Sequence, residues 1–337
     1  MKGTEHHSGG HRKRGLRQEI STRIVRFAMP PAERERLEEV CRQSLVYLAA
    51  AGALSHEVRR TIAQAISVDI ARHAPKLARL LARARAGKID GFYIIDLPVD
   101  IEVARVLLLA ITYAIGLAYN FSTQNGGELV MVLRPDPNSK DANTNSSSEE
   151  FKFHTDDAAI ARSCRVDWIL LYGIVNPPDT VTGYAPIAPV VARLSHRSRA
   201  VLFEERFRVR VPVSFKLGAD IWTDPVAILS HSETGAIELA WPSYATQVVD
   251  DTDQEAADAL AELEALVDQF MVHVPVDPGC MLAFSNFRGV HMRSRIGEGD
   301  RYILRTYARD SLADLREVTD SLGPIFDTQA VVAARRR

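Results

Sequence analysis

The chain has 337 residues, of which 46% are hydrophobic and 25% are charged, so it has an ordinary globular composition and room for one large domain. Its formal net charge of −2 gives no electrostatic reason to expect nucleic acid or an anionic membrane as a partner. The three cysteines, Cys41, Cys164 and Cys280, form no CxxC pair, which argues against a disulfide framework and a thiolate metal site. Without an apolar run of membrane-spanning length or a secretory signal, the sequence predicts a cytoplasmic protein.

The N-terminal part of the chain divides into a polar tail and a helical layer. Residues 1–20 are polar and are expected to be disordered. Residues 31–85 are rich in Ala, Leu, Arg and Glu, with Gly52 between two stretches, which is typical of amphipathic helices. We therefore predict a single domain over residues 21–337, in which residues 21–88 form a helical layer that covers the remainder.

Residues 89–310 have the pattern of a domain core built from short strands. Residues 101–119 are almost entirely apolar and predict a buried helix, and residues 253–270, with Asp253 at the N-cap position, predict an inserted helix. Many short strands separated by Gly and Pro favour a mixed α and β fold, with a sandwich or jelly roll inside and helices outside. The predicted strands are residues 91–98, 129–133, 168–175, 180–185, 207–215, 227–229, 237–241, 271–274, 280–284 and 302–307.

Residues 134–150 form the most polar stretch of the chain and are rich in Asn, Ser and Asp. Loops of this length are uncommon inside compact domains and often act as lids or binding loops. Because the stretch lies directly before the next motif, our preferred interpretation is a mobile cover over a site. A plain solvated loop is the alternative.

The motif Phe153-His154-Thr155-Asp156 places an imidazole and a carboxylate two positions apart. In an extended strand such residues point to the same face, so His154 and Asp156 can converge on one metal ion. An HxD pair alone is a weak signal, but His291 follows an apolar strand far downstream. Two histidines and one carboxylate form the facial triad of non-haem Fe(II) oxygenases. We therefore predict His154, Asp156 and His291 as metal ligands and catalytic residues.

Two arginines, Arg301 and Arg305, lie four positions apart on a predicted strand and should share one face of it. A buried guanidinium without a partner is costly, and no acidic residue occupies a matching strand position. Arginine forks onto carboxylates with paired hydrogen bonds, so a dicarboxylate cosubstrate and a carboxylate-bearing substrate would satisfy both side chains. Salt bridges to Asp or Glu elsewhere in the chain are the alternative.

The ordered combination of His154-Thr155-Asp156, a distal His291 and the block at residues 300–305 resembles Fe(II)/2-oxoglutarate-dependent oxygenases. Among these it is most similar to the clavaminate synthase-like group, which includes hydroxylases of free arginine, asparagine and lysine. The resemblance covers roughly residues 90–310 and implies a double-stranded β-helix, or jelly roll, with flanking helices. It also implies that the metal is Fe(II), with 2-oxoglutarate and O2 as cosubstrates.

The resemblance assigns further residues to cosubstrate and substrate. Arg301 matches the arginine that binds the distal carboxylate of 2-oxoglutarate, and Thr182 matches a threonine that assists its binding. Arg305 matches a second arginine that contacts the substrate carboxylate. The short turn before Arg301 leaves open whether Arg301 or Arg305 is the main cosubstrate anchor. The chain departs from the group at Asp156, where glutamate is more common, and at Met131, where a glutamine holds the substrate amine.

Together these features predict a dioxygenase that hydroxylates an unactivated C–H bond of an amino acid or amino-acid derivative in secondary metabolism. The same cofactor chemistry on a non-amino-acid carboxylate, with desaturation or cyclisation as outcome, is one alternative. The other is a non-catalytic jelly-roll binding protein in which His154 and His291 have structural roles. The expected partner is a small molecule in each case.

Overall fold

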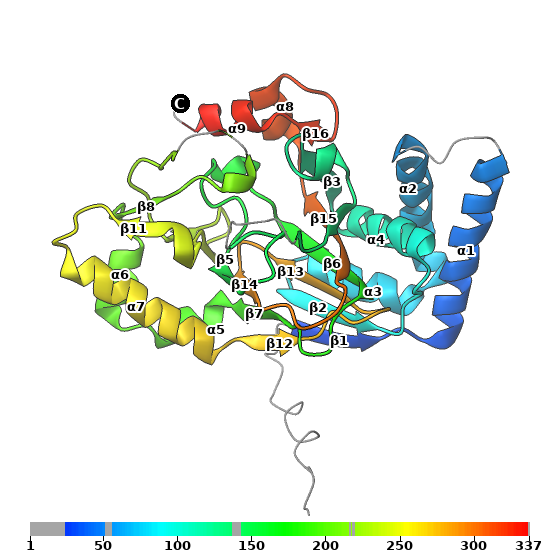
Figure 1. Cartoon of the computed structure of the whole chain (residues 1–337), viewed down its shortest axis with the longest axis horizontal. Helices are drawn as coiled ribbons and strands as arrows, with labels where there is room; N and C mark the ends of the chain where they lie inside the picture. Colours follow the sequence, from blue (N-terminus) through cyan, green and yellow to red (C-terminus); the bar gives the residue numbers. More distant parts are fainter. Residues whose placement is uncertain (1–23, 51–55, 137–142, 216, 218–219, 336–337) are drawn as a thin grey trace, which may run out of the picture.

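The structure is a computed structural model that describes residues 24–50, 56–136, 143–215, 217 and 220–335. The tail predicted at residues 1–20 lies outside the described residues. Two β-sheets form the centre of the fold, and helices cover the outer side of each sheet (Figure 1). The chain is therefore mixed α and β, as the sequence predicts.

The large sheet has eight strands in the order β1-β2-β13-β6-β15-β3-β16, with β4 paired to β15 off this path. Most neighbours are antiparallel, but β1 pairs with β2, and β16 with β3, in parallel. The strands are β1 (Ile24–Ala28), β2 (Gly91–Ile95), β3 (Leu117–Phe121), β4 (Met131–Leu133), β6 (Trp168–Val175), β13 (Met281–Ser285), β15 (Tyr302–Arg309) and β16 (Ile325–Phe326).

The small sheet has four strands in the order β12-β7-β14-β5, all antiparallel to their neighbours. Two further pairs, β9 with β10 and β8 with β11, lie outside both sheets. The bounds are β5 (Phe151–His154), β7 (Thr182–Pro186), β8 (Phe207–Val209), β9 (Leu229–His231), β10 (Ile237–Leu239), β11 (Thr246–Val248), β12 (Val272–Val274) and β14 (Gly289–Arg293).

Strand β6 shows why the central strands have nearly continuous apolar sequences. Successive side chains of a strand point to opposite faces. Leu170 and Tyr172 belong to the core beneath the helices, whereas Ile169 and Leu171 belong to the core between the sheets. The sheets face each other there, because the Tyr184 ring of β7 stacks on Phe284 of β13 at 5.0 Å. Both faces are buried, so both sets of side chains are apolar.

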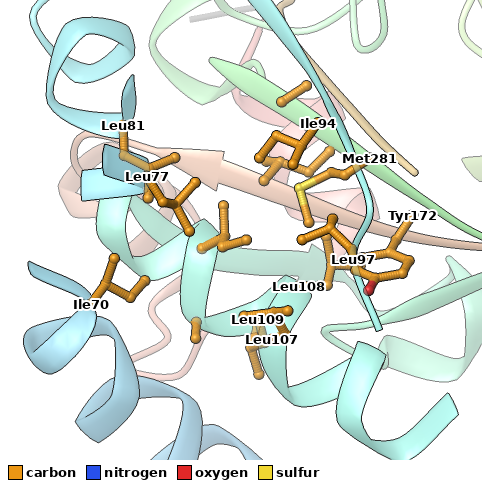
Figure 2. Close-up of a cluster of buried hydrophobic side chains, with 14 of the residues drawn as sticks. Ile70, Leu77, Leu81, Ile94, Leu97, Leu107, Leu108, Leu109, Tyr172 and Met281 are labelled. Carbon is orange, nitrogen blue, oxygen red and sulfur yellow. The ribbon is translucent and has the colours of Figure 1, made fainter. Parts of the chain in front are cut away.

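Four helices cover the outer face of the large sheet, and α4 lies directly on it. Figure 2 shows side chains of α2, α3 and α4 gathered against Ile94, Tyr172 and Met281 of the sheet. Helix α4 is apolar almost all round because it is enclosed by the sheet and the other helices, and the Asp100 side chain caps its first turn. The bounds are α1 (Pro31–Ala50), α2 (His56–His73), α3 (Pro75–Arg85) and α4 (Ile101–Ile115).

A second group of helices packs on the outer face of the small sheet. Ala185 and Val290 of that sheet share a core with α5, α6 and α7 (Figure 1). Asp253 caps α7 by accepting a hydrogen bond from Ala256 N at 3.0 Å, as the sequence predicts. The bounds are α5 (Ile187–Arg193), α6 (His196–Leu202), α7 (Gln254–Gln269), α8 (Ala313–Thr319) and α9 (Thr328–Ala334), with 3-10 turns η2 (Asn125–Gly127), η3 (Arg162–Cys164), η4 (Val213–Phe215) and η5 (Ser243–Ala245).

Several elements differ from their predicted bounds. The apolar run at 101–119 is not one helix, because α4 ends before Gly116 and the chain continues into β3. The run at 207–215 is a strand only as far as Val209 and ends in η4. Residues 24–28, placed in the helical layer by the sequence, form β1, which gains its hydrogen bonds from β2. The cysteines are free, and within the described ranges no helix is long and apolar enough to cross a membrane.

Candidate metal centre

The fold brings the predicted ligands together at the edge of the small sheet formed by β5. His154 ends β5, and His291 lies directly opposite it on the neighbouring strand β14. One ligating atom from each of His154, Asp156 and His291 lies within 4.8 Å of the others. Asp156 lies beyond the end of β5, so the strand-face argument does not explain its position. Other contacts hold it in place.

The backbone around Asp156 is fixed by hydrogen bonds to two other segments, through the side chain of Asn286 and the backbone of Trp241. The Asn286 side chain accepts a hydrogen bond from Asp156 N at 2.8 Å and donates one to Asp156 O at 2.9 Å. Thr155 N donates to Trp241 O at 3.1 Å, and Trp241 N donates to Thr155 Oγ1 at 2.9 Å. The HxD segment is therefore held on both sides, which orients the carboxylate toward the histidines without a regular strand.

The protonation states in the cluster suit a divalent cation. His154 Nδ1 lies 2.7 Å from Lys152 O, so a proton on Nδ1 would be donated there and the Nε2 lone pair left for a metal. Asp156 Oδ1 lies 3.4 Å from His154 Nε2 and 3.6 Å from His291 Nε2. Burial, and next His154, hold the pKa of His291 well below its usual range. This keeps its imidazole neutral, as metal binding requires.

The Asp156 carboxylate stays ionised despite its burial. Burial alone raises its pKa, but His154, His291 and Arg305 outweigh that effect and hold the pKa of Asp156 well below its usual range. The cluster thus offers the Nε2 atoms of two imidazoles and one anionic carboxylate. These side chains fit a metal of the facial-triad type, with one face left open to other ligands.

Arg305 has an acidic partner, contrary to the prediction from strand positions. Its Nη1 lies 3.4 Å from Asp156 Oδ2, and its Nη2 donates to Gln124 Oε1 at 3.2 Å and lies 3.3 Å from Met131 Sδ. The sequence could not indicate this pairing, because Asp156 follows a strand of the other sheet. Tyr307, two residues further along β15, also donates its hydroxyl to Asp156 Oδ2, at 2.5 Å.

Arg301 has no ion pair among the described residues. Its side chain is 3% exposed, and its Nε lacks a hydrogen-bond partner. Burial, reinforced by repulsion from Arg293, lowers the pKa of Arg301 to about 9. Arg301 and Thr182 line one cavity together with His154 and His291. A cavity with an unpaired guanidinium and the edge of the ligand cluster suits a small carboxylate that reaches from the arginine to the metal.

A second cavity also borders the ligand cluster and shares His154 and Arg305 with the first. Gln124, Tyr244 and residues 209–215 line it. Residues 143–145, from the predicted cover, also line it, whereas residues 137–142 lie outside the described residues. His154 lines both cavities, Asp156 lines the second and His291 the first, so each cavity gives a small molecule access to the ligand cluster.

Asp157 also lines the second cavity, but its Oδ2 atom is buried. Its backbone has φ of 62°, and Oδ2 is buried without a hydrogen-bond partner. Burial, and next the charge of Asp156, raise the pKa of Asp157 to about 8. The Asp157 carboxylate accepts a hydrogen bond from the backbone of Val166. This side chain therefore belongs to the wall of the site.

Sequence reasoning missed three residues of the site: Asn286, Tyr307 and Gln124. None of the three belongs to a sequence motif that indicates a functional role. Asn286 and Tyr307 act across long sequence separations on Asp156, so only the tertiary register identifies them. Gln124 could have been suggested by the absence of a glutamine at Met131, since both side chains contact Arg305.

The sequence profile of the Taurine catabolism dioxygenase TauD, TfdA family matches residues 55–307. Clavaminate synthase 2 of Streptomyces clavuligerus is 25% identical over 204 residues, which cover 58% of this chain and 61% of that protein. Enduracididine beta-hydroxylase of Streptomyces hygroscopicus is 26% identical over 199 residues, which cover 51% of this chain and 56% of that protein. The matches thus span about three fifths of the length of these relatives.

Solved structures share the fold over most of the chain. Asparagine oxygenase in complex with Fe(II), 2S,3S-3-hydroxyasparagine and succinate superposes with a TM-score of 0.77 at 23% identity, covering 90% of this chain and 99% of that chain. The non-heme iron oxygenase OrfP in complex with Fe and alpha-ketoglutaric acid superposes with a TM-score of 0.73 at 22% identity, covering 87% and 96%. At these identities the likeness establishes the fold.

Proposed function

The chain belongs to the Taurine catabolism dioxygenase TauD, TfdA family, and from this premise we propose that it is an Fe(II)- and 2-oxoglutarate-dependent dioxygenase. The observation that carries the proposal is the convergence of His154, Asp156 and His291 within 4.8 Å, beside the unpaired Arg301. When bound, Fe(II) and 2-oxoglutarate use O2 to hydroxylate an unactivated C–H bond, with formation of succinate and CO2. The protein supplies binding, orientation and exclusion of water.

The residues divide into ligands and a cosubstrate anchor. His154 and His291 offer imidazole nitrogens and Asp156 offers an anionic oxygen, which leaves the remaining metal positions open. We assign the distal carboxylate of 2-oxoglutarate to Arg301, with Thr182 in the same cavity. Arg305 is the weaker candidate for this anchor because it already contacts Asp156 and Gln124. In this assignment the large and small sheets are the two halves of a double-stranded β-helix.

The second cavity is the proposed substrate site. Arg305 and Gln124 are hydrogen-bonded to each other in its wall, and together they would hold a substrate carboxylate beside the metal. Solved relatives with this fold hold 3-hydroxyasparagine in one case and hydroxylated arginines in another, which supports an amino acid or a derivative as substrate. Hydroxylation of such a substrate is the proposed reaction.

The charges of this cavity favour a substrate whose side chain is not cationic. Among the described residues that line it, the carboxylates are Asp156 and Asp157. Asp156 is engaged with the histidines, Arg305 and Tyr307, and Oδ2 of Asp157 is sealed from the cavity. Neither offers a free carboxylate to a guanidinium or ammonium group, which leaves a cationic side chain without a partner in this cavity. We therefore propose a neutral or acidic side chain.

A substrate panel tests this function. Protein supplied with Fe(II), 2-oxoglutarate and O2 is incubated with asparagine, glutamine, aspartate, glutamate, arginine or lysine, and with their N-acyl derivatives. We expect succinate release and a product heavier by one oxygen atom with neutral or acidic members, and none with His154→Ala. Turnover of arginine or lysine alone would overturn the substrate class but leave the oxygenase. Equal succinate release by His154→Ala would overturn the oxygenase.

A further inference from the structure

We propose that Tyr307 is a positioning residue that fixes the Asp156 carboxylate so that a single oxygen faces the metal. The inference rests on the proposed metal site but not on the identity of the substrate. Tyr307 lies on strand β15, whose alternate residues Ile303, Arg305 and Tyr307 point to the space between the sheets. Tyr307 is 1% exposed, so its ring is held by packing and its hydroxyl has one direction to face.

The two oxygens of Asp156 have separate partners. Oδ1 lies 3.4 Å and 3.6 Å from Nε2 of the two histidines, on the side where a shared metal would lie. Oδ2 accepts the Tyr307 hydroxyl at 2.5 Å. A carboxylate can bind a metal through one oxygen or through both. Holding Oδ2 against a donor on the opposite side therefore favours the one-oxygen mode and leaves the next metal position open.

Arg305 also contacts Oδ2, but it constrains the Asp156 carboxylate less than Tyr307 does. Its Nη1 contact is long, at 3.4 Å, and the same guanidinium is shared with Gln124. Under the proposed function Arg305 also binds the substrate carboxylate, which would compete with Asp156 for its donors. Its guanidinium lies 4.6 Å from the centre of the Tyr307 ring, so the ring also restrains it. Tyr307 is the donor that stays on Asp156 whether or not substrate is present.

The test compares Tyr307→Phe with Tyr119→Phe. Tyr119 is a matched control because it is fully buried, its ring lies 5.9 Å from that of Tyr307, and its hydroxyl lacks a partner in the described structure. Loss of such an outer partner of a metal ligand costs about 10–100-fold in metal affinity or activity. We expect Ni(II), measured by calorimetry with 2-oxoglutarate present, to bind Tyr307→Phe about 10–100-fold more weakly than wild type. Tyr119→Phe should bind Ni(II) like wild type.

A coupling measurement adds a readout that a loss of folding would not mimic. With a loosely held Asp156, Tyr307→Phe should release more succinate per hydroxylated product than wild type, measured at a temperature at which the variant is fully folded. Equal Ni(II) affinity and equal coupling in Tyr307→Phe and Tyr119→Phe would overturn the proposal. If the wild type itself fails to bind Ni(II), the proposed metal site fails instead.

A crystal structure of the wild-type protein with Ni(II) and 2-oxoglutarate tests the geometry without any variant. We expect Oδ1 of Asp156 alone on the metal and the Tyr307 hydroxyl on Oδ2. Both carboxylate oxygens on Ni(II), or a Tyr307 hydroxyl turned away from Asp156, would overturn the proposal even if Tyr307→Phe does not fold.

Discussion

Replacing Arg301 by methionine should stabilise the protein in the absence of ligands and remove its response to 2-oxoglutarate. Burial, with repulsion from Arg293, lowers the pKa of Arg301 to about 9 from 12.5. A shift of this size corresponds to about 5 kcal/mol against the charged form. Arginine nevertheless stays protonated in proteins, so the buried charge destabilises the folded protein unless an anion is bound beside it.

The expected gain in the free energy of unfolding is smaller than the cost of burying the charge, because local relaxation relieves part of that cost. Replacing buried charges by apolar side chains of similar volume has stabilised proteins by about 1–4 kcal/mol. We expect Arg301→Met to raise the free energy of unfolding by a value in that range. The assay is urea denaturation of protein freed of metal by a chelator, repeated with Ni(II) and 2-oxoglutarate. Wild type should gain stability from 2-oxoglutarate, and Arg301→Met should not.

Arg288→Met is the matched control, because Arg288 is a half-buried arginine with partners. Its Nε lies 3.1 Å from Asp90, and its other nitrogens donate to Gly87 O and Ile89 O. Losing these contacts should destabilise the protein and leave its response to 2-oxoglutarate intact. The reasoning on Arg301 is refuted if Arg301→Met is destabilised like Arg288→Met, or if it keeps the full stabilisation by 2-oxoglutarate.

Two further substitutions test the surroundings of the ligand cluster. The raised pKa of Asp157, about 8, means that its folded state binds a proton more tightly than the unfolded state, so its contribution to stability is complete below about pH 4 and is lost as the pH rises to 8. The free energy of unfolding of Asp157→Asn should therefore rise relative to that of wild type by up to about 1.4 kcal/mol per pH unit between pH 5 and 8, in urea denaturation of metal-free protein. A difference independent of pH would contradict the raised pKa. Asn286→Ala removes the hydrogen bonds that hold the Asp156 backbone and should cost about 2–3 kcal/mol in the same assay and weaken Ni(II) binding, whereas unchanged Ni(II) affinity would show that Asp156 is held by other contacts.

The sequence predicts the central strands well because their signal is local. Strands β6 and β13 are short apolar runs bounded by turn residues, and burial of both faces makes them apolar throughout. The apolar run through α4 into β3 is divided only by Gly116, and because helix and strand are both buried, hydrophobicity does not change at that point. Strand β1 owes its existence to parallel pairing with β2, which its own residues do not encode.

The site was predictable only where the residue type itself limits the chemistry. His154, Asp156 and His291 combine metal-binding side chains with a spacing that places two of them close together, and the fold supplies the third. The role of Tyr307 could not be predicted, since a tyrosine on an apolar strand is usually a core residue. The partner of Arg305 was missed for a related reason, because Asp156 approaches it from a loop beyond the other sheet.

The most direct measurement of the central claim is the visible absorption of the protein after anaerobic addition of Fe(II) and 2-oxoglutarate. Chelation of Fe(II) by 2-oxoglutarate in a site made by His154, Asp156 and His291 predicts a charge-transfer band in the wild type. The band should be absent from His154→Ala and weakened in Arg301→Met. A wild-type protein that develops no band would contradict the account and favour a binding protein in which the two histidines are structural.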